Sequence, residues 1–160
     1  MQYDPLMGKA VGTVETQYQP LNYLLFDLTS YGYLAALLLF VAFVVFKRRG
    51  PLLAALGATW VFFALHTAAL ALRWWESHKL GIGHAPITNL YESLVFLAWV
   101  CVGGFIIIER KFKLPAVGLI AMLFSFGLMT YAHTGGVQQK IQPLVPALQS
   151  YWLLVHVTVV

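Results

Sequence analysis

Apolar residues in this chain gather in long runs, separated by short polar or basic stretches. Four runs, at about 29–46, 51–72, 90–109 and 114–133, approach the roughly 20 residues that a helix needs to cross a bilayer. A fifth run begins near Tyr151 and is still apolar at Val160. The pattern predicts an all-α integral membrane protein with four complete transmembrane helices and the start of a fifth.

The two ends of the sequence differ from this central part. Residues 1–28 are mixed in polarity and are expected to form an outer N-terminal segment, with 21–28 partly in the membrane interface; 29–160 form the transmembrane domain. The run at 151–160 is too short to cross about 30 Å of hydrocarbon, and stopping there would leave backbone carbonyls unsatisfied in lipid. We therefore expect the sequence to be the N-terminal part of a longer protein.

Composition and charge placement support a membrane location. Hydrophobic residues make up 60% of the chain and charged residues only 10%, whereas soluble domains carry roughly 25% charged residues. The net charge of +4 comes largely from two clusters, at 47–49 and 110–113, each of which follows an apolar run. Such clusters orient membrane helices and do not form a nucleic-acid surface. Both connections are expected to be cytoplasmic, which places the N-terminus and the loops 73–88 and 134–150 outside.

Other residue types refine this topology. Seven aromatic residues are expected near the outer boundary, where amphipathic rings anchor helices: Tyr31, Tyr33, Trp74, Trp75, Tyr91, Tyr131 and Trp152. Cys101 is the only cysteine, so the chain has no disulfide framework, no two-cysteine metal site and no CxxCH haem-attachment motif. The pair Gly103–Gly104 in the third run is expected to allow close helix packing.

The segment from His84 to Trp99 places a polar turn directly before an apolar run. Pro86 disfavours helix in the residue before it, and Asn89 followed three residues later by Glu92 has the spacing of a capping box. The third helix is therefore predicted to begin here, with His84, Asn89, Tyr91 and Glu92 at one membrane edge. Glu92 fits a capping role and a binding role equally well. Arg73, at the outer end of the second run, can snorkel, pair with Glu76 or meet an anionic group.

The five histidines are the main candidates for chemistry. His156 and His66 each lie about 8–9 Å from the outer end of a predicted helix. An imidazole at that depth can ligate haem iron, exchange protons or hydrogen-bond a neighbouring helix, and the residues alone leave these alternatives open. Trp152 and His156 are four residues apart and would share a helix face. His78 is expected to be solvated, and His133 to lie at the membrane boundary.

Two segments resemble the CcsA family of haem-handling membrane proteins, which act in cytochrome c biogenesis system II. They are GHAPITNLYESLVFLAW at 83–99 and PLVPALQSYWLLVHV at 143–157. Together with Arg73–Trp74 they match the family in order and spacing over most of the chain after Pro51. The first 50 residues carry only a generic helix.

The resemblance implies a role in binding haem at the outer membrane face and presenting it to apocytochrome c, with a ResB/CcsB-type partner. His156 corresponds to an axial ligand of that haem (haem b), and Trp152, Glu92, His84 and Asn89 are expected to support the site. The bacterial cytoplasmic membrane, or the thylakoid membrane of a plastid, is the implied location. The family's tryptophan-rich motif and its later histidines do not occur in this sequence, so these residues alone are not expected to complete haem attachment.

Two other functions fit the same residues. One is a subunit that transports haem or another solute. The other is a cytochrome b-type respiratory subunit in which His66 and His156 form a ligand pair. Bound haem in this piece alone would favour the respiratory subunit.

Overall fold

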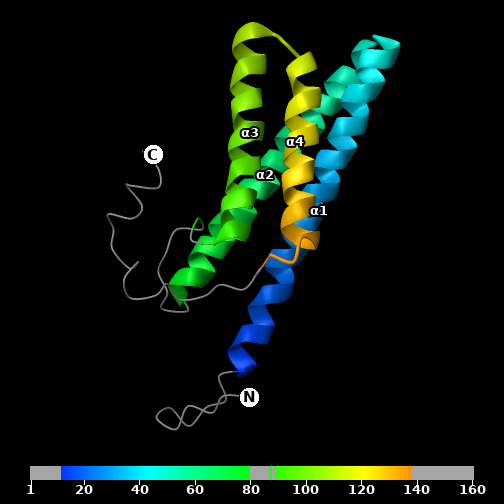
Figure 1. The fold of residues 1–160 in the computed structure, drawn as a ribbon. Helices are drawn as coiled ribbons and strands as arrows, with labels where there is room; N and C mark the ends of the chain where they lie inside the picture. The colour runs from blue at the N-terminus through cyan, green and yellow to red at the C-terminus, as the bar shows by residue number, and fades with distance from the viewer. Residues whose placement is uncertain (1–11, 80–86, 88, 138–160) are drawn as a thin grey trace.

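The computed structural model describes residues 12–79, 87 and 89–137, which form four helices in an up-and-down arrangement (Figure 1). They are α1 (Gly12–Phe46), α2 (Arg49–Lys79), α3 (Leu90–Phe112) and α4 (Ala116–Thr134). All four contain a stretch long and apolar enough to cross a membrane; in α1 it is Tyr23–Phe46. The prediction of an all-helical protein with four spans is confirmed. The predicted fifth run lies outside the described residues.

The first two helices are longer than their apolar runs. α1 begins at Gly12 rather than near residue 29, so helix continues through the stretch predicted to lie partly in the interface. α2 continues past residue 72 to Lys79. A charged residue limits an apolar run but does not end an α-helix, so Asp27 and Arg73 lie within α1 and α2. The depth of 21–28 in a membrane remains a prediction.

The ends of α3 and α4 lie close to the predicted positions. Asn89 is the N-cap of α3: its side-chain oxygen accepts a hydrogen bond of 2.7 Å from the backbone N–H of Glu92. α3 ends at Phe112, where Lys113 adopts a left-handed conformation (φ 55°). Pro115 then precedes α4, which begins two residues later than its apolar run.

Both basic connections lie at the same end of the bundle (Figure 1). We call this the basic end; it carries Lys47 and Arg48 between α1 and α2, and residues 113–115 between α3 and α4. The prediction that the two basic clusters share one side is consistent with this arrangement. The opposite end carries the C-terminal turns of α2 and α4 and the first turn of α3, and we call it the polar end.

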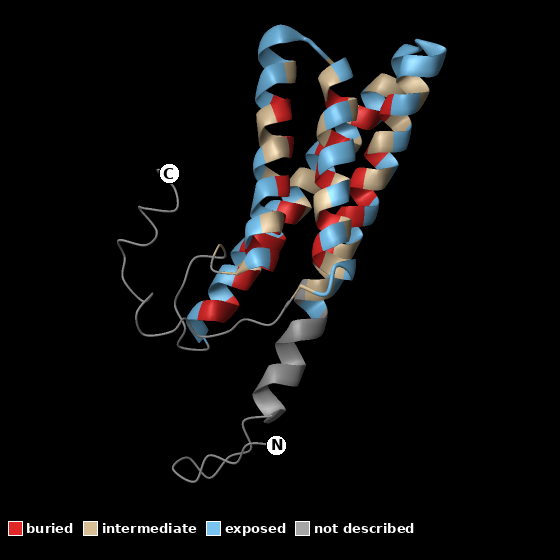
Figure 2. Ribbon diagram, in the orientation of Figure 1, coloured by how far each residue is buried: buried red, intermediate tan, exposed pale blue. Residues whose placement is uncertain are grey.

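The interior is built mainly by three helix pairs. α1 packs against α2 and α4, and α3 packs against α4, whereas α2 and α3 touch much less (Figure 2). Towards the basic end, the rings of Phe40 and Phe105 meet edge to face at 5.6 Å. Gly118 lets α4 approach both rings, since a Cβ there would lie 2.5 Å from Phe40.

The glycine pair singled out in the sequence is not where the helices come closest. A Cβ at Gly104 would meet nothing within 4 Å, and one at Gly103 would make an ordinary contact of 3.4 Å with Phe63. The close approaches are instead at Gly118 and at Gly32, which lies directly against the ring of Phe62. The prediction for Gly103–Gly104 was therefore wrong, because glycine spacing within one helix does not report the ring opposite it.

Candidate functional site

A buried ion pair joins α2 to α3 at the polar end. Nε of Arg73 donates to Oε1 of Glu92 at 3.0 Å, and the two side chains are only 3% and 4% exposed. Burying an unpaired charge is costly, so each side chain needs the other. From the sequence three alternatives were open for Arg73, and a pair with Glu92 on the neighbouring helix was not among them; at 3% exposure the side chain does not snorkel to the surface. Glu92 is thus an ion-pair partner as well as part of the capped first turn.

Tyr91 packs beside this pair in the interior. Its ring lies 5.1 Å from the guanidinium carbon of Arg73, a cation–π arrangement, and meets Phe26 and His133 edge to face at 6.2 and 5.7 Å. Tyr91 is fully buried, and so is Tyr33. Both were predicted to lie near the outer boundary; their rings face the bundle interior, and their depth in a membrane stays a prediction. The Tyr33 hydroxyl hydrogen-bonds His66, whereas the buried Tyr91 hydroxyl has no hydrogen-bond partner among the described residues.

A second polar contact links the first and last described helices. Nε2 of His133 on α4 lies 3.1 Å from Oδ1 of Asp27 on α1, and Nδ1 of His133 is 2.7 Å from the carbonyl oxygen of Met129. The Asp27 side chain is half exposed, so the pair lies at the rim of the polar end. His133 was expected at the membrane boundary, and it has in addition a partner across the bundle. All four helices therefore contribute a charged or titratable side chain to this end.

His66 lies deeper, on the interior face of α2. Its Nδ1 is 2.8 Å from the hydroxyl of Tyr33 on α1, and its ring meets the edge of Phe26 at 5.8 Å. His66 is fully buried, and among the described residues its Nε2 has no hydrogen-bond partner. Of the roles left open for His66, the hydrogen bond to a neighbouring helix is confirmed.

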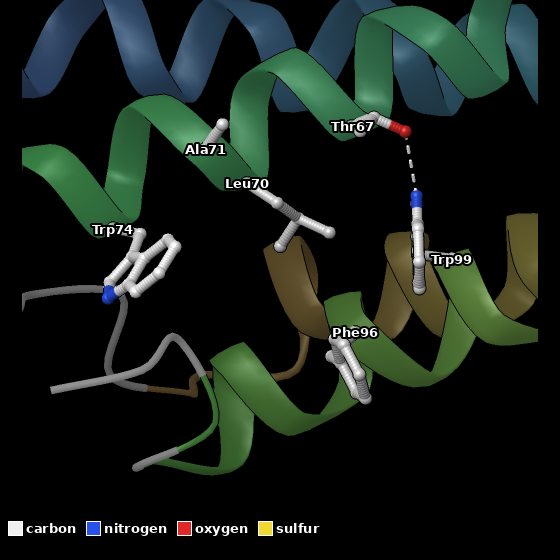
Figure 3. Close-up of a pocket in the computed structure, with 6 residues that line it drawn as sticks. All are labelled: Thr67, Leu70, Ala71, Trp74, Phe96 and Trp99. Carbon is white, nitrogen blue, oxygen red and sulfur yellow. Dashed lines mark hydrogen bonds between the residues drawn. The ribbon is translucent and has the colours of Figure 1, made fainter.

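An apolar groove runs between α2 and α3, where these helices diverge (Figure 3). Its volume is about 360 Å³, and its lining comes from one face of α2 and one face of α3: Thr67, Leu70, Ala71, Trp74, Phe96 and Trp99. The indole N–H of Trp99 donates to the Thr67 hydroxyl at 2.8 Å. The same indole stacks between Phe63 and Phe96, with ring centroids 5.4 and 5.7 Å away. Trp99 is therefore a fixed wall of this groove.

Several predicted site residues fall outside the described part of the chain: His84, Trp152 and His156. Asn89 and Glu92 are described, and the structure brings them together with Arg73 and Tyr91. Within the described residues no group of three or more His, Cys, Asp or Glu side chains could hold a metal ion. His78 is exposed as expected, with its Nδ1 3.0 Å from the Trp74 carbonyl. The contributions of Tyr33 and Asp27 were missed, because nothing local in the sequence marks partners on other helices.

Comparison with known proteins relates the second half of the chain to one group. Residues 87–160 match the family described as Cytochrome C assembly protein. The cytochrome c biogenesis protein CcsA of Synechococcus sp. (strain CC9311) is 45% identical over 96 residues, which is 59% of this chain. Over this stretch the chain is similar to the CcsA proteins. The stretch that begins α3 with its Asn89 cap and the Glu92 carboxylate thus belongs to the matched region.

Two further relatives give the same result. CcsA of Parasynechococcus marenigrum (strain WH8102) is 45% identical over 98 residues, covering 60% of this chain and 30% of that protein. CcsA of Prochlorococcus marinus (strain MIT 9303) is 44% identical over 96 residues, covering 59% of this chain and 29% of that protein. The matched part of the chain thus spans less than a third of the length of these relatives. No solved structure matches the chain.

Proposed function

We propose that this chain takes part in cytochrome c biogenesis, by binding haem at the outer membrane face and presenting it for covalent attachment to apocytochrome c. The observation that carries the proposal is the similarity of residues 87–160 to Cytochrome C assembly proteins and to CcsA. Haem is the substrate in this role, and haem b is the form that carries no covalent attachment before the reaction.

The proposed axial ligand of the haem iron is His156, which lies in the matched region. A neutral imidazole can bind iron through one ring nitrogen while the other is oriented by a hydrogen bond. Trp152, four residues earlier in sequence, and His84 are proposed to support the site. The six residues that line the α2–α3 groove include no histidine, so this groove by itself offers the iron no imidazole.

The polar end would hold the residues next to the proposed haem site in fixed positions. The Arg73–Glu92 pair fixes the first turn of α3 against α2, and the Asn89 cap fixes where that turn begins. The segment that carries His84 leads directly into this turn in sequence. The ion pair and the cap therefore fix the position of its C-terminal end. A site that binds a ligand gains affinity when its supporting residues are already in position.

The partners and location follow from the same proposal. The chain would act with a ResB/CcsB-type membrane protein, in the bacterial cytoplasmic membrane or a thylakoid membrane. The polar end would face outward and the basic end the cytoplasm, in keeping with the preference of Lys and Arg for cytoplasmic connections. The four apolar helices support a location in a membrane, without saying which membrane it is.

The proposal is tested with the full-length coding sequence, co-expressed with a ResB-type partner and a reporter apocytochrome c in a host that lacks its own system. In His156→Ala we expect covalent haem on the reporter to fall by about tenfold or more, as loss of metal-site residues does. Added imidazole should restore part of the yield, since it can occupy the vacated iron position. His78→Ala is the matched control, because His78 is an exposed histidine at the polar end.

Unchanged haem content and unchanged reporter maturation in His156→Ala would overturn the assignment of that ligand. Maturation that fails equally in His156→Ala and in His78→Ala, with both proteins present in the membrane, would also contradict it. If the wild-type protein supports no maturation with any ResB-type partner yet moves haem across vesicles, the role in attachment is wrong and transport is favoured.

A further inference from the structure

The basic end and the helix turns next to it carry uncompensated positive charge. Both connections lie there, and Figure 2 shows them exposed. Glu109 is the only acidic residue in 46–60 and 105–118, but six exposed cations fall in the same ranges: Lys47, Arg48, Arg49, Arg110, Lys111 and Lys113. Within the described part of the chain none of the six belongs to an ion pair, whereas Arg73 at the polar end is paired with Glu92. A charge surplus of this kind attracts an anion from outside the bundle.

Two of the six cations occupy backbone positions that favour glycine. Lys47 has φ 52° and Lys113 has φ 55°, a left-handed conformation that is strained for residues with a Cβ. Each backbone N–H closes a helix end by donating at 2.8 Å to a carbonyl oxygen four residues earlier, of Phe43 and Glu109 respectively. A glycine would donate the same hydrogen bonds without strain. What lysine adds at both positions is a positive charge.

Arg110 is the cation whose surroundings are defined by a second helix. Its guanidinium carbon on α3 lies 4.6 Å from the centre of the Trp60 ring on α2, a cation–π contact between the two helices. Trp60 is 43% exposed, so the guanidinium covers only part of the indole. Neither the guanidinium donors of Arg110 nor the indole N–H of Trp60 has a hydrogen-bond acceptor among the described residues. Arg110 and Trp60 therefore present several donors together at the surface of the bundle.

We propose that Arg110, Lys111 and Trp60 bind the phosphate of an anionic phospholipid. An arginine fork can hold two phosphate oxygens at once, and a neighbouring lysine adds a second positive charge. Tryptophan rings are enriched where lipid headgroups meet hydrocarbon, and the indole N–H can donate to the same headgroup. Next to these residues both helices expose apolar side chains, with Val61 64% and Ile107 67% exposed, and these offer the acyl chains a surface.

The position of Trp60 favours a lipid over a soluble anion. Trp60 lies about 16 Å along the axis of α2 from Arg49, inside the stretch that is apolar enough to cross a membrane. A soluble anion would have to leave water to reach this ring, whereas the acyl chains of a lipid already lie in the bilayer. Anionic lipids also give the cytoplasmic leaflet its negative potential, in keeping with the orientation proposed above. The site is at the opposite end of the bundle from the proposed haem site, so it can hold or fail independently of the proposed function.

Lipid binding to the purified full-length protein tests the site. Native mass spectrometry gives dissociation constants for phosphatidylglycerol, which is anionic, and for phosphatidylcholine with identical acyl chains, which is zwitterionic. We expect phosphatidylglycerol to bind at least about fivefold more tightly. Arg110→Gln should weaken its binding by about tenfold, the effect of losing a charge-assisted hydrogen bond, and should leave phosphatidylcholine unchanged. The matched control is Arg48→Gln, which removes an exposed arginine from the other connection and should change binding by less than about twofold.

Three results of this experiment would overturn the proposal. The first is equal dissociation constants for the two lipids, and the second is an equal loss in Arg110→Gln and Arg48→Gln, which would indicate diffuse attraction rather than a site. The third is displacement of phosphatidylglycerol by an equal concentration of inorganic phosphate, which would make the ligand a free anion. If Arg110→Gln does not fold, Arg110→Lys takes its place; it keeps the charge but loses the fork, and it should bind more weakly than wild type and still prefer phosphatidylglycerol.

Fluorescence quenching locates the lipid without changing any cation. The full-length protein is reconstituted into vesicles with equal amounts of the two lipids, of which only one carries bromine on its acyl chains. Tryptophan quenching should be greater when phosphatidylglycerol carries the bromine, and Trp60→Phe should remove most of this difference. Trp74→Phe, which removes an exposed tryptophan at the polar end, should leave it in place. A difference that survives Trp60→Phe, or no difference in the wild type, overturns the proposal.

Discussion

Arg73 and Glu92 form an ion pair of 3.0 Å that is almost completely withdrawn from solvent, although the residues lie 19 positions apart on different helices. Glu92→Gln leaves the guanidinium buried without its charge partner, and we expect a loss of about 3–5 kcal/mol in unfolding free energy. The double variant Arg73→Met/Glu92→Met should lose much less than the sum of the single changes. Thermal unfolding in detergent, followed by circular dichroism, measures all of them. Additive losses would show that the two side chains do not interact.

The start of α3 depends on the Asn89 cap. Its side chain accepts a hydrogen bond of 2.7 Å from the Glu92 backbone, so Asn89→Ala removes that acceptor and should cost about 1 kcal/mol. Asn89→Asp keeps an oxygen at this position and should stay close to wild type. The same unfolding measurement compares them. An equal loss in both variants would mean that the cap contributes little.

The Tyr33–His66 hydrogen bond is tested by removing a single oxygen atom. Tyr33→Phe leaves a buried imidazole nitrogen without its partner, and we expect a cost of about 1–3 kcal/mol. Tyr31→Phe is the control on the same helix, because Tyr31 is exposed, and it should change stability by less than about 0.5 kcal/mol. Similar effects in the two variants would contradict the assigned bond.

Two glycines in α4 should respond in opposite directions to the same substitution. Gly118→Ala places a methyl group against Phe40 and Phe105, and overpacking of this kind costs about 1–3 kcal/mol. A Cβ at Gly127 meets nothing within 4 Å, so Gly127→Ala should be neutral or stabilise the helix by up to about 1 kcal/mol. Unfolding of the two variants under identical conditions gives the comparison. A loss at Gly127 as large as at Gly118 would contradict the packing described here.

The orientation of the bundle in the membrane can be tested by cysteine labelling. If the basic end faces the cytoplasm, a cysteine placed at Lys47 in the Cys101→Ser background should resist a membrane-impermeant maleimide in intact cells. A cysteine placed at the exposed His78 should react. Permeabilised cells serve as the control, since both positions should then be labelled. The reverse pattern would place the basic end outside.

Features set by neighbouring residues could be predicted from the sequence, and features set by distant ones could not. The Asn89 cap lies three residues from the group it binds, so its spacing was visible directly. Glu92 was predicted to have a capping or a binding role, and its partner Arg73 on α2 was not identified. The spans were recognised because apolar runs of that length have few other uses.

The direction in which a side chain points within the bundle could not be predicted from the sequence. Tyr33 and Tyr91 have the composition of boundary anchors, yet both rings face the interior, where His66 and Arg73 are their neighbours. A position in a run gives the depth of a residue, and depth alone does not say which side of the helix faces protein. The same lack of rotational information caused the wrong prediction for Gly103–Gly104.

The pairing of Arg73 with Glu92 also has a consequence for biosynthesis. The two charges come from successive helical hairpins, α1–α2 and α3–α4, and α2 leaves the ribosome first. The acidic first turn of α3 can therefore be buried beside its counter-charge only once the first hairpin is in place. Burial of the second hairpin's acidic turn thus depends on the position of the first hairpin.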